Sequence, residues 1–174
     1  MKFAATTTRL FPILTIVSLT LTGCDDPGLD NLKTYQKTIR DALGESELEK
    51  RQEGDEERLY RRDDQTPYSG WFAARWNEND PDVRILAQYK NGSKDGPYIE
   101  YDEMLNEKLK GQYKNGKKDG FWTEAGPEEG LLQAGHYKDG RKDGPWTETR
   151  FDEDSESGVT ETEVNYVNGE RMTP

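Results

Sequence analysis

The sequence is poor in the residues that build a thick hydrophobic core. Hydrophobic residues make up 31% of the 174 residues and charged residues make up 34%, so apolar material is scarce. A domain of two thick layers is therefore not expected. Aromatic residues are nevertheless 10% of the chain, which argues against simple disorder. They favour a thin fold held together by tyrosine and tryptophan, which bury a large area per residue.

Cysteine and histidine are almost absent, with one residue of each. His136 stands where related segments carry Gln88 and Gln112, so it is expected to be a sheet-surface residue rather than a catalytic base. A serine–histidine–aspartate set cannot be assembled around it. The phosphate-binding motif GxxxxGK[ST] and the dinucleotide motif GxGxxG are also missing. We therefore expect a protein that is not an enzyme, with no catalytic residue, no metal site and no cofactor.

Positive charge is in deficit, because the formal net charge is −11. Nucleic-acid binding depends on clustered lysine and arginine that neutralise phosphates. An acidic chain of this kind is a poor candidate for such binding. We expect no nucleic-acid partner.

Long hydrophobic runs are missing as well, since a membrane-spanning helix takes about 20 apolar residues. The longest apolar run covers residues 10–21 and follows two positive residues, Lys2 and Arg9. A positive start before a short apolar run is typical of a signal peptide. The run ends in Leu21-Thr22-Gly23-Cys24, which contains the only cysteine.

These four residues resemble the bacterial lipobox. The resemblance implies cleavage after residue 23, lipidation of the Cys24 thiol with acyl chains such as palmitate, and a mature chain that begins at Cys24. The protein would then be anchored to a membrane of the bacterial cell envelope without spanning it, and would face the periplasm or the exterior. The alternative is an ordinary signal peptide with a chance cysteine.

Residues 24–57 are polar and acidic and predict a tether with one short helix. Four apolar residues in this stretch fall on one helical face, which predicts a helix over about 30–43. The remainder, residues 45–57, is rich in charge and is expected to be a solvated linker. The four apolar residues are Leu32, Tyr35, Ile39 and Leu43.

A phrase of eleven residues recurs in the second half of the chain with a period of 24 residues. The copies read QYKNGSKDGPY (88–98), QYKNGKKDGFW (112–122) and HYKDGRKDGPW (136–146). A period of this size indicates a repeat architecture in which each copy is one supersecondary unit. The Asn-Gly and Asp-Gly pairs are hairpin-turn signals, so each copy predicts two antiparallel strands.

The residues between these turns predict an all-β domain over 58–174, built as a meandering antiparallel sheet. The flanking segments are aromatic and β-branched, and the prolines within them argue against helix. The predicted strands cover residues 70–76, 83–90, 96–102, 107–114, 120–124, 131–138, 144–151 and 159–167, with a short one at 58–62.

The YKNG and KDG turns with their flanking aromatic residues resemble the MORN-repeat variant found in YwqK-type bacterial proteins. The resemblance covers residues 58–174. It implies a sheet of MORN-like β-hairpins of about 24 residues each. The label of this family often includes the antitoxin of a toxin–antitoxin system, which implies an antitoxin-like role.

Each copy carries a tyrosine and, nine residues later, a second tyrosine or a tryptophan. A wide loop between them would place both side chains directly opposite each other on one face. A tight Asn-Gly turn would instead pair Tyr89 with Lys94, and the wide loop is favoured because Asp-Gly closes it on the other side. The predicted aromatic ladder consists of Tyr89, Tyr98, Tyr113, Trp122, Tyr137 and Trp146.

The ladder has two interpretations. The simpler one is that it forms the core of a single-layered sheet, because aromatic cross-strand pairs commonly stabilise sheets. The functional alternative is a stacking platform for sugar rings or a peptide, with Tyr98, Trp122 and Trp146 as candidate contacts.

The loops of a meander leave alternately from the two ends of its strands, and here the two ends differ in charge. Loops 90–95, 114–119 and 138–143 are net positive, whereas the acidic segments lie at the other end. The basic edge is a candidate surface for anionic headgroups and the acidic edge for a basic partner, although solvated turns are the simpler interpretation. The acidic segments are 77–82, 102–107, 124–129 and 152–156. The candidate contact residues of the basic edge are Lys114, Lys117, Lys118, Lys138, Arg141 and Lys142.

Together these features predict a membrane-anchored, non-catalytic repeat lipoprotein that serves as a protein-binding or scaffolding module at the cell envelope. One alternative is an immunity or antitoxin protein that binds a basic toxin. A third is a module that binds glycan or peptidoglycan.

Overall fold

The computed structural model describes residues 32–77, 80–126, 130–151 and 158–172. The predicted signal peptide, Cys24 and the first two residues of the predicted helix lie outside these ranges. Helix α1 (Leu32–Asp41) is followed by eleven described strands. These are β1 (Leu48–Glu53), β2 (Glu56–Arg61), β3 (Gly70–Arg75), β4 (Val83–Lys90), β5 (Ser93–Tyr101), β6 (Glu107–Lys114), β7 (Lys117–Ala125), β8 (Leu131–Lys138), β9 (Arg141–Phe151), β10 (Val159–Val167) and β11 (Glu170–Arg171).

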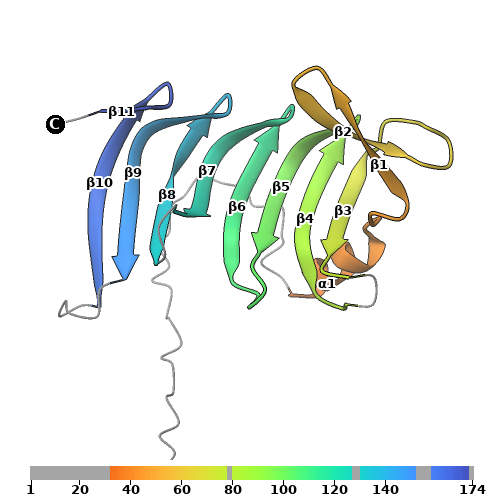
Figure 1. Cartoon of the computed structure of the whole chain (residues 1–174), viewed down its shortest axis with the longest axis horizontal. Coiled ribbons are helices and arrows are strands. Elements are labelled where there is room, and N and C mark those ends of the chain that lie inside the picture. The colour runs from red at the N-terminus through yellow and green to blue at the C-terminus, as the bar shows by residue number, and fades with distance from the viewer. Residues whose placement is uncertain (1–31, 78–79, 127–129, 152–157, 173–174) are drawn as a thin grey trace, which may run out of the picture.

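Strands β3 to β11 form one nine-stranded sheet in which each strand pairs with its neighbours in sequence (Figure 1). All the pairings are antiparallel. The predicted all-β antiparallel fold with one short helix is therefore confirmed. Strands β4, β6, β8 and β10 have the predicted bounds, whereas β5, β7 and β9 each begin earlier than expected.

Tight two-residue turns explain this difference. At the β4–β5 turn Asn91 and Gly92 both have positive φ, 50° and 86°, and Tyr89 pairs with Lys94. The same pattern recurs at Asn115-Gly116 and Asp139-Gly140. The predicted wide loop is therefore wrong, because asparagine, aspartate and glycine accept positive φ and this turn matches the twist of the strands.

The Asp-Gly pairs lie within the strands instead of closing loops. In β5, Lys94 and Tyr98 pair with Tyr89 and Ala87, so β5 carries the longer stretch between these two pairs. Gly96 lies in this irregular stretch with φ of 119°. Similar register shifts occur between β6 and β7 and between β8 and β9. The extra residues form a bulge, which bends the strand locally.

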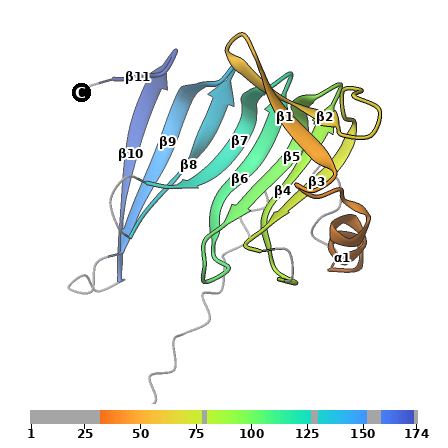
Figure 2. The same cartoon turned by 45° about the vertical axis from the view of Figure 1, so that its right-hand side comes forward.

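Residues 45–57 are not a solvated linker, and that prediction is wrong. Strands β1 and β2 pair over their full lengths and form a separate two-stranded sheet. The hairpin lies over the N-terminal strands of the large sheet (Figure 2). Its residues Leu48 and Leu59 belong to the buried core cluster. Two buried leucines among charged residues give only a weak sequence signal, because the rest of the hairpin faces water.

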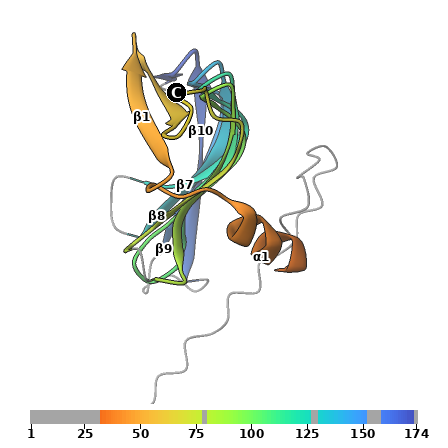
Figure 3. The same ribbon diagram turned by 90° about the vertical axis from the view of Figure 1, so that its right-hand side faces the viewer.

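Helix α1 covers the opposite face at the same end of the sheet (Figure 3). Its residues Tyr35 and Ile39 pack against Ala73, Val83 and Leu86. The predicted helix is confirmed over α1, and its apolar side packs on the chain's own sheet. The first strands of the sheet are thus covered on both faces.

Candidate functional site

The aromatic side chains form a continuous row on one face of the sheet. Neighbouring ring centroids lie 5.1–6.1 Å apart, and most pairs meet edge to face. The predicted ladder is confirmed in this region and extends to Tyr166, whereas Tyr89 packs on Phe72 instead. The aromatic ladder, as we use the term, consists of Tyr98, Tyr113, Trp122, Tyr137, Trp146 and Tyr166.

Each ladder tryptophan lies flat over a glycine of the neighbouring strand. An added Cβ at Gly111 would lie 2.2 Å from the Trp122 ring, and one at Gly135 would lie 2.4 Å from the Trp146 ring. The two indole N–H groups donate to backbone carbonyls at 3.1 Å. Glycine therefore supplies the space for each ring, and the ring covers the backbone that glycine exposes.

Burial decides between the two interpretations of the ladder. Trp122, Trp146 and Tyr98 are 0%, 1% and 6% exposed. A sugar or peptide cannot stack on rings that solvent does not reach. These three candidate residues therefore belong to the core of a single-layered sheet.

Lysine side chains cover the ladder from above. Because the turns are tight, Lys118 pairs with Tyr113 and Lys142 pairs with Tyr137, on the ladder face. The Lys118 Nζ lies 4.5 Å from the Trp122 ring centroid, and the Lys142 Nζ lies 3.9 Å from that of Trp146. Ammonium groups over aromatic faces are attracted by the ring electrons. Each lysine also shields a ring that has no second protein layer above it.

Glu124 joins the two lysines. Its carboxylate oxygens lie 3.0 Å from Lys118 Nζ and 2.7 Å from Lys142 Nζ, and it accepts a hydrogen bond from the Tyr137 hydroxyl. Burial raises the pKa of Glu124, but the hydrogen bonds from Lys142 and Lys118 outweigh burial and the pKa is lowered overall. The Glu124 carboxylate is therefore ionised and holds both lysines over the ladder.

The corresponding lysine of the first copy lacks this arrangement. Lys94 makes no ion pair within the described residues, and its burial lowers the pKa of its amine. The glutamate at the matching position, Glu100, accepts a hydrogen bond from Tyr98 and lies 3.8 Å from Lys108. The copies are therefore alike in backbone but different in electrostatics.

The basic edge is smaller than the sequence predicted. Lys118 and Lys142 belong to the ladder and do not serve as edge contacts, which corrects that prediction. Lys114, Lys117, Lys138 and Arg141 are exposed at the edge. The last three line a hollow of about 240 Å³ together with Asp139 and Asp143, so its charge is mixed. Of the predicted acidic segments, residues 78–79, 127–129 and 152–156 lie outside the described part of the chain.

The face of β7, β8 and β9 that lies opposite the aromatic ladder carries no charged side chain between Asp119 and Asp143 at one end and the far ends of the strands at the other. The pairing of Thr123, Ala134 and Thr147 across these strands shows that they share this face. Phe121, Leu132 and Phe151 are 39%, 38% and 54% exposed. We call this surface the uncharged face. It consists of Phe121, Thr123, Ala125, Leu132, Ala134, His136, Pro145, Thr147, Thr149 and Phe151.

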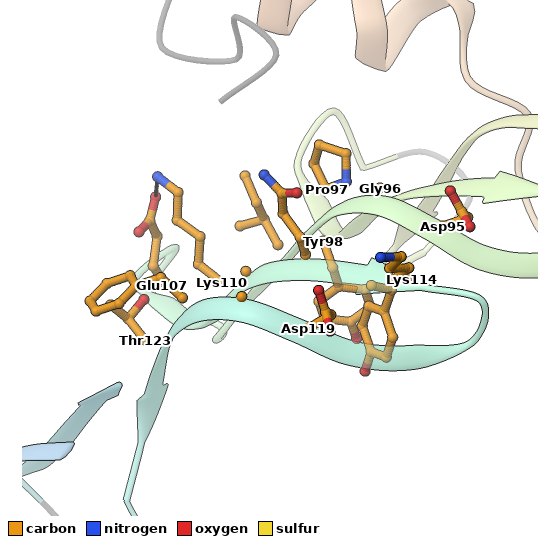
Figure 4. Close-up of a pocket in the computed structure, with 15 residues that line it drawn as sticks. Asp95, Gly96, Pro97, Tyr98, Glu107, Lys110, Lys114, Asp119 and Thr123 are labelled. Carbon is orange, nitrogen blue, oxygen red and sulfur yellow. Dashed lines mark hydrogen bonds and ion pairs between the residues drawn. The ribbon is translucent and has the colours of Figure 1, made fainter. Parts of the chain in front are cut away.

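A groove of about 730 Å³ lies beside the uncharged face across β5, β6 and β7, and its lining includes charged residues. Pro97, Lys110 and Phe121 are among its lining residues, and Lys110 is held by Glu107 at 3.4 Å (Figure 4). The sequence carried a signal for the uncharged face, because alternate residues of the later copies are uncharged in a chain rich in charge. The repeat pattern does not reveal this surface, because its residues differ from copy to copy.

The described residues include no group of three or more histidine, cysteine, aspartate or glutamate side chains able to hold a metal ion. His136, the only histidine, packs against Phe121 with ring centroids 5.4 Å apart. Within the described ranges, no helix has the length and apolar character needed to cross a membrane.

Comparison with protein-family models and with curated proteins finds no match to this sequence.

Proposed function

We propose that the chain is a lipid-anchored, non-catalytic repeat protein of the MORN-variant type that binds a partner protein at the bacterial cell envelope. The uncharged face of β7–β9 is the binding surface. The observation that carries this proposal is an exposed surface without charge in a chain that is 34% charged. Loss of charged residues and exposed aromatic side chains mark the centres of protein interfaces.

The lipid anchor would hold the start of the described fold close to the membrane. The described fold begins at Leu32, eight positions after Cys24. Eight extended residues span at most about 28 Å. The hairpin β1–β2 belongs to the fold, so the tether is far shorter than the stretch 24–57 predicted. The start of α1 would therefore lie near the membrane, with the uncharged face farther along the same sheet.

The other two functions differ in their support. An immunity or antitoxin protein that binds a basic toxin is favoured by the formal net charge of −11. The glycan-binding function loses its candidate contacts, because Tyr98, Trp122 and Trp146 are buried. A protein partner therefore remains the function that the surface supports best.

The test is cross-linking of the full-length protein in native membranes, followed by identification of the bound protein. The variant Phe121→Lys/Phe151→Lys places charge on the uncharged face, and we expect it to reduce capture of the partner at least about tenfold. The control is Lys114→Glu, which changes an exposed side chain at the basic edge and should leave capture unchanged.

Two further results complete this test. The variant Cys24→Ser should move the protein from the membrane fraction to the soluble fraction if the cysteine carries the anchor. Capture that survives in the double variant but is lost in Lys114→Glu would show that the basic edge, and not the uncharged face, binds the partner. Urea unfolding of each variant separates a loss of binding from a loss of fold.

A further inference from the structure

The two outer edges of the large sheet differ in how many of their outward backbone groups are hydrogen-bonded. At the β3 edge, Leu43 accepts a hydrogen bond from the Ala73 N–H and donates one to the Trp71 carbonyl, both at 2.9 Å. Two outward backbone groups in the middle of β3 are thereby paired. At the other end, β11 covers only Tyr166 and Val167 of β10.

The backbone of β10 presents hydrogen-bonding groups beyond the reach of β11. The Met172 N–H donates to the Asn165 carbonyl at 2.8 Å, so Asn165 points its backbone groups away from β9. Orientation alternates along a strand, and Glu163 and Glu161 therefore point the same way. Among the described residues no backbone group pairs with these outward N–H and C=O groups. Such a row is a template for another strand.

The side chains of this edge specify the strand that fits it. Glu161 and Glu163 lie on the same face as Thr147 and Thr149 of β9, and both are exposed. Thr160 and Thr162 lie on the ladder face, where Val164 packs beside Trp146. A strand added here would place alternate residues next to the two glutamates and the others next to the threonines. Opposite charges across neighbouring strands are stabilising.

We propose that the β10 edge binds an extended segment of another protein by strand addition, and that this segment carries lysine or arginine at alternate positions with β-branched residues between them. Backbone hydrogen bonds to Glu161 and Glu163 supply the docking. The two carboxylates select basic side chains, as pockets for alternate residues do in other strand-addition sites. This edge adjoins the uncharged face, because its two glutamates pair with Thr147 and Thr149, but its docking groups are the backbone N–H and C=O groups of β10.

A second copy of the chain fits this edge less well. If β10 paired antiparallel with β10 of a second copy, with the two Thr162 residues opposite each other, Glu161 of each copy would lie opposite Glu163 of the other. Like charges directly opposite on neighbouring strands are destabilising. The glutamates therefore discourage self-association and admit a basic strand.

The experiment uses the full-length protein in detergent and a synthetic heptapeptide that alternates lysine with valine or threonine. Amide hydrogen exchange is measured with and without the peptide. We expect exchange of the Glu161 and Glu163 amides to slow by about tenfold or more, since these N–H groups become hydrogen-bonded. A peptide with the same sequence, N-methylated on the pairing side, should give no protection.

Two variants separate the backbone from the charge contribution. Glu161→Pro removes an outward N–H and leaves the pairing with β9 intact, so it should abolish peptide binding without unfolding the sheet. Glu161→Gln/Glu163→Gln should weaken binding and remove most of its salt dependence. The control Glu103→Gln changes an exposed glutamate in the β5–β6 loop and should bind as the native protein does.

Three outcomes overturn the proposal. Peptide binding with unchanged exchange at Glu161 and Glu163 would place the peptide elsewhere. Absence of binding by both the lysine peptide and a matched glutamate peptide would show that this edge takes no added strand. Protection of both amides without peptide, rising with protein concentration, would assign the edge to a second copy. Phe121→Lys alone, on β7 and separated from β10 by β8 and β9, should leave peptide binding intact, so this test and that of the proposed function fail separately.

Discussion

The two ends of the sheet bury their apolar side chains by different means. At the β3–β5 end, hairpin β1–β2 covers one face and α1 covers the other, and Leu59 and Leu86 are 1% and 0% exposed. At the β7–β10 end no described element covers either face, yet Trp122 and Trp146 are equally buried. Glycine below each ring and lysine above it replace the missing layers. A thin sheet can therefore bury its core with side chains of its own.

This comparison also assigns roles to the two ends. The covered end resembles a cap, which repeat proteins need at their termini. The uncovered end carries both the uncharged face and the open edge of β10. At the uncovered end the buried ladder therefore supplies stability while the exposed side chains are left for binding, and the predictions below test that division in order of decreasing effect.

Trp122→Ala should cause the largest loss, because it removes a fully buried ring from the uncovered end. We expect the free energy of unfolding to fall by about 3–5 kcal/mol, as for other buried aromatic residues. The matched control is its neighbour Phe121, which lies on the opposite face and is 39% exposed. Phe121→Ala should change stability by about 0.5 kcal/mol or less. Equal effects in urea unfolding would contradict the single-layer description.

Gly135→Ala should destabilise the chain by about 1–3 kcal/mol, because the added Cβ overlaps the Trp146 ring. The double variant Gly135→Ala/Trp146→Ala should be no less stable than Trp146→Ala alone. A double-mutant cycle from urea unfolding measures this coupling. Additive losses would show that the glycine is needed for some reason other than the ring.

Glu124→Gln should cost about 1–3 kcal/mol at neutral pH, since it leaves two covered lysines without their carboxylate. The pKa of Glu124 lies below its usual value of 4.5 in the folded chain. Its ionised form therefore adds stability above about pH 4.5, and that stability is lost as the pH falls through the folded pKa. Urea unfolding from pH 7 to pH 3 should show the two proteins converging. A constant difference would exclude the ion pairs as the cause.

The smallest effect is expected at Lys94. Burial lowers the pKa of this amine, so its charge opposes folding, and Lys94→Met should change stability by about 1 kcal/mol or less in either direction. Lys142→Met should destabilise more, because Glu124 then keeps only one lysine. The same loss for both variants would show that the copies are electrostatically equivalent after all.

Sequence reasoning recovered the sheet well, because Asn-Gly turns and alternating aromatic residues are local signals. Sequence reasoning failed where two local structures, such as a wide and a tight turn, fit the same residues almost equally well. The sequence allows both a wide and a tight turn, and the predicted wide turn places Lys118 and Lys142 at the edge, whereas the tight turn places them on the ladder. Hairpin β1–β2 was missed because only Leu48 and Leu59 mark it. Burial of Trp122 depends on a glycine eleven residues earlier, which no local pattern reveals.

The candidate surfaces were harder still. The residues that recur in every copy mostly build turns or the ladder. The uncharged face comes from the positions that vary between copies, such as Phe121, Pro145 and Phe151. Which of those positions share a face depends on register, and a bulge in each hairpin shifts it. Only the assembled sheet places them together.

Oxidative footprinting with hydroxyl radicals tests the central claim most directly, because it reports the exposure of individual side chains. It is carried out on the purified protein and on the protein in native membranes. We expect Phe121 and Phe151 to be oxidised in the purified protein and protected in membranes, while Trp122 and Trp146 stay shielded in both. Oxidation of the tryptophans at the rate of the phenylalanines, or phenylalanines equally exposed in both samples, would contradict the account.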